Sequence, residues 1–180
     1  MDTEKTIKIR DLKFKPMITA LEIHNRTVEL GAILNQHYGD KIPLFVSILS
    51  GAFVFASDLI RQFDGDCEIG FVKLASYSGT RSTGDIKTVM GLEKDLKNRH
   101  IIVVEDIIDT GKTLHFFLEH LYQQSPASVC TVSLLRKPDA LQVEVQADHI
   151  GFDIENRFVV GYGLDYDGLG RNLPDIYQVI

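Results

Sequence analysis

Residues 101–114 read IIVVEDIIDTGKTL, and no other run of the chain is as informative. Its first four residues are apolar and predict a buried strand. Glu105 and Asp106 follow that strand, and the turn after Asp109 contains a glycine and leads into a helical pattern. Free N–H groups at a helix start bind anions, and neighbouring carboxylates bind hydroxyl groups or a metal ion. The run therefore predicts a site for a ligand with both a phosphate and a diol, such as a ribose 5-phosphate.

The same run also has a purely structural interpretation, in which a core strand precedes a capped helix. Glu105 and Asp106 argue against it, because two like charges at a strand end cost stability unless a cation is bound there. The Gly-Lys-Thr of residues 111–113 resembles the end of a nucleotide-binding P-loop, which needs a glycine five residues before its Gly-Lys pair. That position holds Asp106 instead, and the carboxylate of Asp109 would repel a triphosphate. We therefore exclude a P-loop kinase.

Strand and helix patterns alternate along the chain, which predicts parallel strands joined by right-handed crossovers. The predicted strands are 44–49, 68–75, 86–90, 101–104 and 129–135, and the predicted helices are 19–37, 52–63 and 113–123. The fold class is therefore α/β, with a central, mostly parallel sheet flanked by helices. Ligands of such sheets bind outside the carboxyl ends of the strands, so the loops after the first, second, fourth and fifth strands should face one cleft.

Composition and charge argue against membrane-spanning, secreted and nucleic-acid-binding proteins. The chain has 180 residues, 44% hydrophobic and 24% charged, which predicts one domain with a sizeable core. It contains no apolar run long enough to span a membrane, and its charged N-terminus lacks an apolar secretory core, so we expect a cytoplasmic protein. A net charge of −6 argues against nucleic-acid binding. Cys67 and Cys130 should be buried free thiols.

Residues 103–113 resemble the phosphoribosyl-diphosphate signature of type I phosphoribosyltransferases, most closely in the hypoxanthine (guanine) branch. Four further segments match this family in the same order. They are residues 49–53 (pyrophosphate loop), Ser76 and Tyr77 with 82–87 (mobile loop), 134–137 (purine-contacting lysine), and 158–166 with Arg171 (purine hood). The resemblance implies a single phosphoribosyltransferase domain over residues 1–180. Its core would cover about 16–150, and a small C-terminal hood would cover about 151–180 with the N-terminal segment.

For the sugar, the resemblance implies transfer of a 5-phosphoribosyl group from phosphoribosyl diphosphate with the help of Mg²⁺. Glu105 and Asp106 would contact the ribose hydroxyls directly or through Mg²⁺, and Asp165 would lie near a second metal ion. The 5′-phosphate would sit on the turn that follows, with glycine allowing a close backbone approach. The residues assigned to the phosphoribosyl site are Glu105, Asp106, Asp109, Thr110, Gly111, Lys112 and Thr113.

For the purine, the resemblance implies that Asp109 is the general base near N7 and that Lys137 donates to the oxygen at C6. Phe158 would stack on the base, the backbone of Val159 would read its edge, and Asp165 would lie beside it. Each of these residues also has an ordinary structural interpretation. Asp109 could cap a helix, Lys137 could be a solvated lysine, and Asp165 could belong to a turn.

For the pyrophosphate, the resemblance implies binding by Ser50, Gly51 and the planar guanidinium of Arg171. Relatives often carry Lys where this chain has Ser50, so side-chain help in binding pyrophosphate and in subunit contacts is in question. The backbone at this position can adopt a cis peptide. Ser76 and Tyr77 would lie on a lid loop that closes over the site and excludes water.

The resemblance thus implies a purine salvage enzyme that makes IMP, and also GMP, from a 6-oxopurine base. It also implies a homodimer or homotetramer without nucleic-acid or membrane partners. Two alternatives stay open, namely a xanthine-preferring phosphoribosyltransferase and a phosphoribosyltransferase-like regulator that binds nucleic acid. Lys137 disfavours adenine, and the hood of residues 158–165 disfavours pyrimidines.

Overall fold

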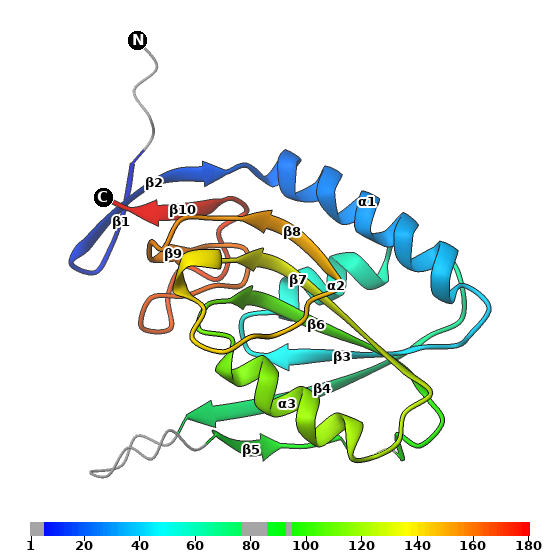
Figure 1. Cartoon of the computed structure of the whole chain (residues 1–180). Helices are drawn as coiled ribbons and strands as arrows, with labels where there is room; N and C mark the ends of the chain where they lie inside the picture. Colours follow the sequence, from blue (N-terminus) through cyan, green and yellow to red (C-terminus); the bar gives the residue numbers. More distant parts are fainter. Residues whose placement is uncertain (1–5, 77–85, 93–94) are drawn as a thin grey trace.

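Two sheets make up the protein, whose computed structural model describes residues 6–76, 86–92 and 95–180. The large sheet has helices on both faces, and the small sheet lies at the end toward which the arrows of β6, β7 and β8 point (Figure 1). The N-terminal and C-terminal segments meet in the small sheet. The carboxyl ends of the parallel strands therefore face the small sheet.

The large sheet has the strand order β5-β4-β3-β6-β7-β8. All neighbouring strands pair in parallel except β4 and β5, which are antiparallel. The strands are β3 (Leu44–Leu49), β4 (Glu68–Ser76), β5 (Ile86–Met90), β6 (His100–Ile108), β7 (Ser128–Arg136) and β8 (His149–Asp153). This arrangement confirms the predicted fold class, although sequence periodicity did not predict β8.

Strand β6 is longer than predicted and corrects the position of the two acids. We expected the strand to end at Val104, but it runs from His100 to Ile108 and carries Glu105 and Asp106 within it. The reason is that β6 keeps its pairing with β7 beyond the acids, up to the partner of Ile108. Because successive strand residues point to opposite faces, the two carboxylates project to different sides of the sheet.

Helices cover the two faces with separate apolar clusters. Helices α1 (Ala20–Tyr38) and α2 (Phe53–Ile60) pack with residues such as Val104 on one face, and α3 (Lys112–Tyr122) packs with residues such as Val103 on the other. Helix α1 begins one residue after the predicted start at Thr19, and Thr19 and Glu22 form a capping box there. Helix α2 ends at Ile60, three residues before the predicted end at Phe63, because tighter backbone bonds to Leu59 and Ile60 replace its last helical turn.

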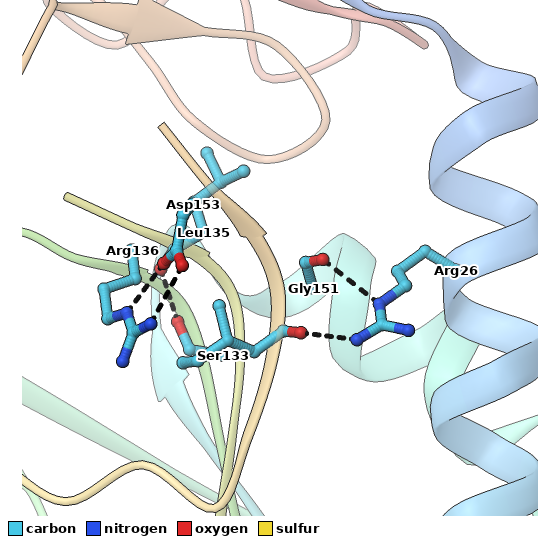
Figure 2. Close-up of polar contacts among 7 residues, drawn as sticks. Arg26, Ser133, Leu135, Arg136, Gly151 and Asp153 are labelled. Carbon is cyan, nitrogen blue, oxygen red and sulfur yellow. Dashed lines mark hydrogen bonds and ion pairs between the residues drawn. The ribbon is translucent and has the colours of Figure 1, made fainter. Parts of the chain in front are cut away.

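Arg26 links helix α1 to the edge strand β8 by hydrogen bonds (Figure 2). Arg26 donates from Nη2 to the carbonyl of Ile150 at 2.8 Å and from Nε to the carbonyl of Gly151 at 3.1 Å. Strand β8 is held on its other side by a bidentate pair between Arg136 and Asp153, at 2.7 and 2.9 Å. The side chain of Arg26 thus satisfies carbonyl groups that an edge strand would otherwise expose.

Arg26→Met should lower the free energy of unfolding by about 1–3 kcal/mol, because two partly buried carbonyls lose a charged donor while the apolar stem is kept. Urea denaturation followed by circular dichroism measures the change. Arg61→Met is the matched control, since the Arg61 side chain is 76% exposed and its pair with Asp58 is 3.8 Å long. Equal losses in the two variants would contradict this role for Arg26.

The small sheet combines both chain ends in the order β1-β2-β10-β9. Its strands are β1 (Ile7–Ile9), β2 (Leu12–Ile18), β9 (Val159–Val160) and β10 (Ile176–Val179). All its pairs are antiparallel, and Phe14, Val160 and Tyr177 form its buried core. The division into core and hood stays a prediction.

Two smaller expectations can be compared with the structure. Cys67 and Cys130 are free, as predicted, but only Cys130 is buried, because Cys67 lies in the turn just before β4. Among the described residues, no helix combines the length and the apolar character needed to cross a bilayer.

Candidate active site

The turn between β6 and α3 forms a small pocket of about 70 Å³. Its lining residues are Glu105, Ile107, Ile108, Asp109, Thr110, Gly111, Thr113 and Leu114. Gly111 is the N-cap of α3 and has a left-handed φ of 80°, which explains the glycine there. Gly111 has no side chain to cap the helix, and the Lys112 N–H donates only a long hydrogen bond of 3.5 Å to Oγ1 of Thr110. An anion at this helix start can therefore bind first-turn N–H groups of α3.

Glu105 lies at the base of this pocket and is 6% exposed. Its Oε2 has no hydrogen-bond partner among the described residues. Burial, and after it the charge of Asp106, raises the pKa of Glu105 well above its ordinary range. A buried acceptor without a partner is costly, which is consistent with a ligand hydroxyl or a cation binding here.

Asp106 lies against the loop that follows β3. A Cβ atom on Gly51 would overlap the Asp106 carboxylate, so glycine is required for this close approach. The peptide between Leu49 and Ser50 is cis, in agreement with the expectation for this loop. Burial raises the pKa of Asp106 to about 6, while the Ile107 N–H, which donates to Oδ1 at 2.8 Å, lowers it.

These two acids should make the free energy of unfolding depend on pH. Their raised pKa values mean that the folded chain binds more protons than the unfolded chain, so stability falls as the pH rises, and for Asp106 this fall runs from about pH 4 through its pKa of about 6. Without ligands and with EDTA, Asp106→Asn should be more stable than the wild type at pH 8 by about 1–3 kcal/mol. The difference should vanish near pH 4.

Urea unfolding at several pH values checks this expectation, with Asp139→Asn, an exposed acid, as the control. A destabilised Asp106→Asn at pH 8, or a difference independent of pH, would contradict the origin assigned to the pH dependence.

Lys137 and Asp109 form an ion pair across the carboxyl ends of β6 and β7. The Nζ of Lys137 lies 3.0 Å from Oδ2 of Asp109. The Lys137 side chain is 7% exposed and that of Asp109 is 49% exposed, so a buried ammonium holds a carboxylate that solvent and ligands can reach. The backbone N–H of Lys137 donates to the carbonyl of Ile108 at 2.9 Å, which fixes the two loops together. Lys137 is therefore not the solvated lysine of the structural interpretation.

Asp165 and Arg171 form the second ion pair of the site, with Nη2 of Arg171 2.6 Å from Oδ1 of Asp165. Arg171 also donates from Nη1 to the carbonyl of Gly163 at 2.6 Å. Gly163 packs directly against the Gly51 carbonyl. Charges on Arg171 and Asp165 influence the pKa of Asp106, the first lowering it and the second raising it. Two of the predicted pyrophosphate residues, Gly51 and Arg171, are thus brought beside Asp106.

Phe158 precedes β9 in the small sheet, where its ring is 42% exposed. The ring packs edge-on against Tyr166 at 5.7 Å and lies 6.3 Å from the ring of Phe14. Val159 is buried in β9. Phe158 therefore offers a supported but accessible aromatic surface, as stacking on a flat ligand requires.

Some predicted site residues do not take part in the side-chain contacts described above. Ser50 and Lys112 are exposed. Tyr77 lies outside the described residues, and for Ser76 only the backbone, at the end of β4, is described. The lid loop therefore stays a prediction.

The donor set suits a magnesium ion bound together with a substrate. Within the described parts of the chain, no three His, Cys, Asp or Glu residues form a metal-binding group of their own. Mg²⁺ commonly uses one or two carboxylates and completes its shell with substrate oxygens and water. Glu105, with its unpartnered Oε2, and Asp106, with its raised pKa, are carboxylates that a cation would stabilise.

Sequence analysis did not identify two N-terminal residues that contact residues 166 and 167, next to the predicted site. Arg10 pairs with Asp167 at 2.8 Å, and Asp11 accepts from the Tyr166 hydroxyl at 2.7 Å. The available signal was the pair of apolar-alternating segments on either side of Arg10 and Asp11, which is typical of a hairpin. Their partners lie 155 to 157 residues away, which no local pattern indicates.

Comparison with known proteins shows which family the chain resembles over most of its length. Residues 19–167 match the family model described as the phosphoribosyl transferase domain. The hypoxanthine-guanine phosphoribosyltransferase of Lactococcus lactis is 43% identical over 161 residues, which cover 89% of this chain and 87% of that protein.

Solved structures agree with the sequence comparison. A hypoxanthine phosphoribosyltransferase from Staphylococcus aureus has a TM-score of 0.88 and 39% identity, covering 94% of this chain and 92% of that one. The hypoxanthine phosphoribosyltransferase of Trypanosoma cruzi, in complex with the product IMP, has a TM-score of 0.87 and 30% identity, covering 97% of each chain.

Proposed function

Because the chain belongs to the phosphoribosyl transferase domain family, we propose that it is a hypoxanthine-guanine phosphoribosyltransferase of purine salvage. It transfers the 5-phosphoribosyl group of phosphoribosyl diphosphate to hypoxanthine or guanine, and it releases IMP or GMP with pyrophosphate. Relatives with this name, at 43% and 40% identity over most of the chain, support the assignment.

The observation that carries the proposal is the contact between Asp109 and Lys137. The carboxylate belongs to the same turn as the anion pocket, and the buried ammonium beside it is a fixed hydrogen-bond donor. A 6-oxopurine has an acidic ring N–H and a carbonyl oxygen on neighbouring positions, which are complementary to this carboxylate and this ammonium. An adenine amino group would instead meet a second donor.

In the proposed reaction, the N–H groups at the start of α3 hold the 5′-phosphate. Glu105 binds the ribose hydroxyls from the side of the α3 pocket, and Asp106 binds them from the side of the loop after β3. The C1′–oxygen bond breaks as pyrophosphate leaves, and positive charge develops on the ribose ring. The purine N9 attacks C1′ while Asp109 accepts the proton at N7. Lys137 keeps the purine oriented through its oxygen at C6, with Phe158 stacked on its face.

Arg171 and the backbone around Gly51 receive the departing pyrophosphate, because a planar guanidinium can bind two phosphate oxygens at once. One Mg²⁺ would be held by Glu105 and Asp106 and a second would lie near Asp165, each completed by substrate oxygens and water, and these ions would neutralise the charge that develops on the leaving group. The lid of Ser76 and Tyr77 would exclude water, which could otherwise hydrolyse the activated sugar.

The test is a direct assay with phosphoribosyl diphosphate, MgCl₂ and each of hypoxanthine, guanine, xanthine and adenine. We expect IMP and GMP to form, and we expect adenine to be inert. Preference for xanthine would favour the alternative specificity, and no nucleotide from any base would overturn the proposal. Omitting MgCl₂ and adding EDTA should abolish turnover, which tests the metal requirement.

A homodimer or homotetramer is expected by analogy with the family and is tested by light scattering. We expect a cytoplasmic location without membrane partners, and the net charge of −6 argues against a nucleic-acid partner. Retention of RNA or DNA on filters at moderate salt would instead favour the regulator.

A further inference from the structure

Two further aromatic rings pack against Phe158, the residue that we assign to purine stacking. The Phe158 ring lies 5.7 Å from that of Tyr166 with an interplanar angle of 78°, and 6.3 Å from that of Phe14 with an angle of 48°. Phe14 and Tyr166 are 6.4 Å apart, so each ring contacts both others. Phe14 is completely buried, whereas Phe158 is 42% exposed. The orientation of the exposed ring is therefore set by the two rings behind it.

Tyr166 also belongs to the hood turn, which we define as residues 166–169. Backbone bonds in both directions between Tyr166 and Leu169 close this turn. The N–H of Gly168 donates to Oδ2 of Asp165 at 2.7 Å, and the other oxygen of that carboxylate binds Arg171. The hood turn thus supports Phe158 through a ring and Asp165 through a backbone donor.

The hood turn is bound by the hairpin turn, which we define as Arg10 and Asp11 between β1 and β2. The Tyr166 hydroxyl donates to Oδ1 of Asp11 at 2.7 Å. The Nε of Arg10 lies 2.8 Å from Oδ2 of Asp167. Two consecutive hairpin residues therefore bind two consecutive residues of the hood turn. Both contacts are solvent-exposed, but only the hydrogen bond to the charged Asp11 acts directly on the Tyr166 ring, because the Arg10–Asp167 pair holds the neighbouring residue.

We propose that the hairpin turn is a positioning element for the purine site. Asp11 holds Tyr166 by its hydroxyl, and Tyr166 holds the Phe158 ring in the orientation on which the purine stacks. The inference rests on the proposed function, because it assigns Phe158 to purine stacking. It makes Tyr166 and Asp11 positioning residues that act through Phe158 and touch no substrate. Loss of the hydroxyl bond leaves the anion pocket between β6 and α3 unchanged, since that pocket contains no residue of either turn.

Steady-state kinetics of Tyr166→Phe and Asp11→Ala test the proposal. Each variant should raise KM for hypoxanthine about threefold to tenfold, the effect of one lost hydrogen bond on ring orientation, with KM for phosphoribosyl diphosphate and kcat changed less than about twofold. Calorimetric titration with IMP should show the same weakening. Asp11→Asn keeps an acceptor oxygen at the same place and should restore KM close to the wild-type value.

Tyr177→Phe is the matched control. Tyr177 also donates its hydroxyl to an aspartate, Asp175 at 3.2 Å, in the same sheet, but it forms no ring pair with Phe158 among the described residues. It should leave both KM values unchanged. A wild-type chain that makes no IMP would overturn the proposed function and this inference together. An active wild type would overturn the inference alone if Tyr166→Phe left KM for hypoxanthine unchanged, or if both KM values rose in step.

Discussion

Asp109→Asn should lower kcat with hypoxanthine about 10²–10⁴-fold, the usual contribution of a positioned general base. The substitution keeps the shape of the side chain and an acceptor for Lys137, but it removes the basicity needed to take the purine proton. KM for phosphoribosyl diphosphate should change little, because the N–H groups at the start of α3 are untouched. Initial rates of IMP formation under saturating substrates measure the effect.

Stability must be followed in the same experiment, because Asp109 is the ion-pair partner of the buried Lys137. Replacing the carboxylate by a neutral amide should cost about 1–3 kcal/mol, so rates are measured well below the melting temperature. Asp109 does not cap α3, whose N-cap is Gly111, so a capping defect cannot account for lost turnover. Asp139→Asn should keep wild-type rates. Wild-type turnover in Asp109→Asn would remove Asp109 from the role of base.

The pairing of Asp109 with Lys137 illustrates what the sequence could and could not predict. Each residue was identified from its own segment, but they lie 28 positions apart and nothing local indicated a contact. The contact arises because β6 and β7 are parallel neighbours whose register places Ile108 opposite Arg136, one residue before each partner. Strand boundaries from periodicity alone missed this, since β6 was expected to end at Val104.

Local sequence patterns predicted the ends of helices and strands best where the apolar periodicity stops at a turn-forming or helix-capping residue. Strands β3 and β5 have the predicted bounds, and α1 begins directly after Thr19. Patterns were least informative at the ends of the chain, where β1 and β10 have only three and four residues and are stabilised by pairing with β2. The hood could be inferred only from the family resemblance, and its attachment to the hairpin turn only from the structure.

Gly51→Ala should reduce kcat/KM for phosphoribosyl diphosphate about 10²-fold or more, because a shift of about 1 Å in a positioning group can have that effect. The added Cβ would overlap the Asp106 carboxylate, which is held in place by the Ile107 N–H at 2.8 Å. Either Asp106 leaves its position, or the loop after β3 moves away from β6. Both outcomes separate the ribose carboxylates from the residues that bind pyrophosphate.

Gly70→Ala is the matched control, because its Cβ would lie 2.7 Å from Cδ2 at the flexible end of Leu92 and in ordinary contact with Leu44, and a small rotation of Leu92 relieves the close contact. It should keep kcat/KM within about twofold, since Gly70 lies in β4 away from the carboxyl ends of the strands. Melting temperatures of both variants show whether a loss of activity comes from unfolding or from displacement of Asp106 or of the loop after β3. A folded Gly51→Ala with wild-type kcat/KM would show that contact between this loop and Asp106 is not needed for transfer, and the pyrophosphate site would then have to be sought elsewhere along the edge of the sheet.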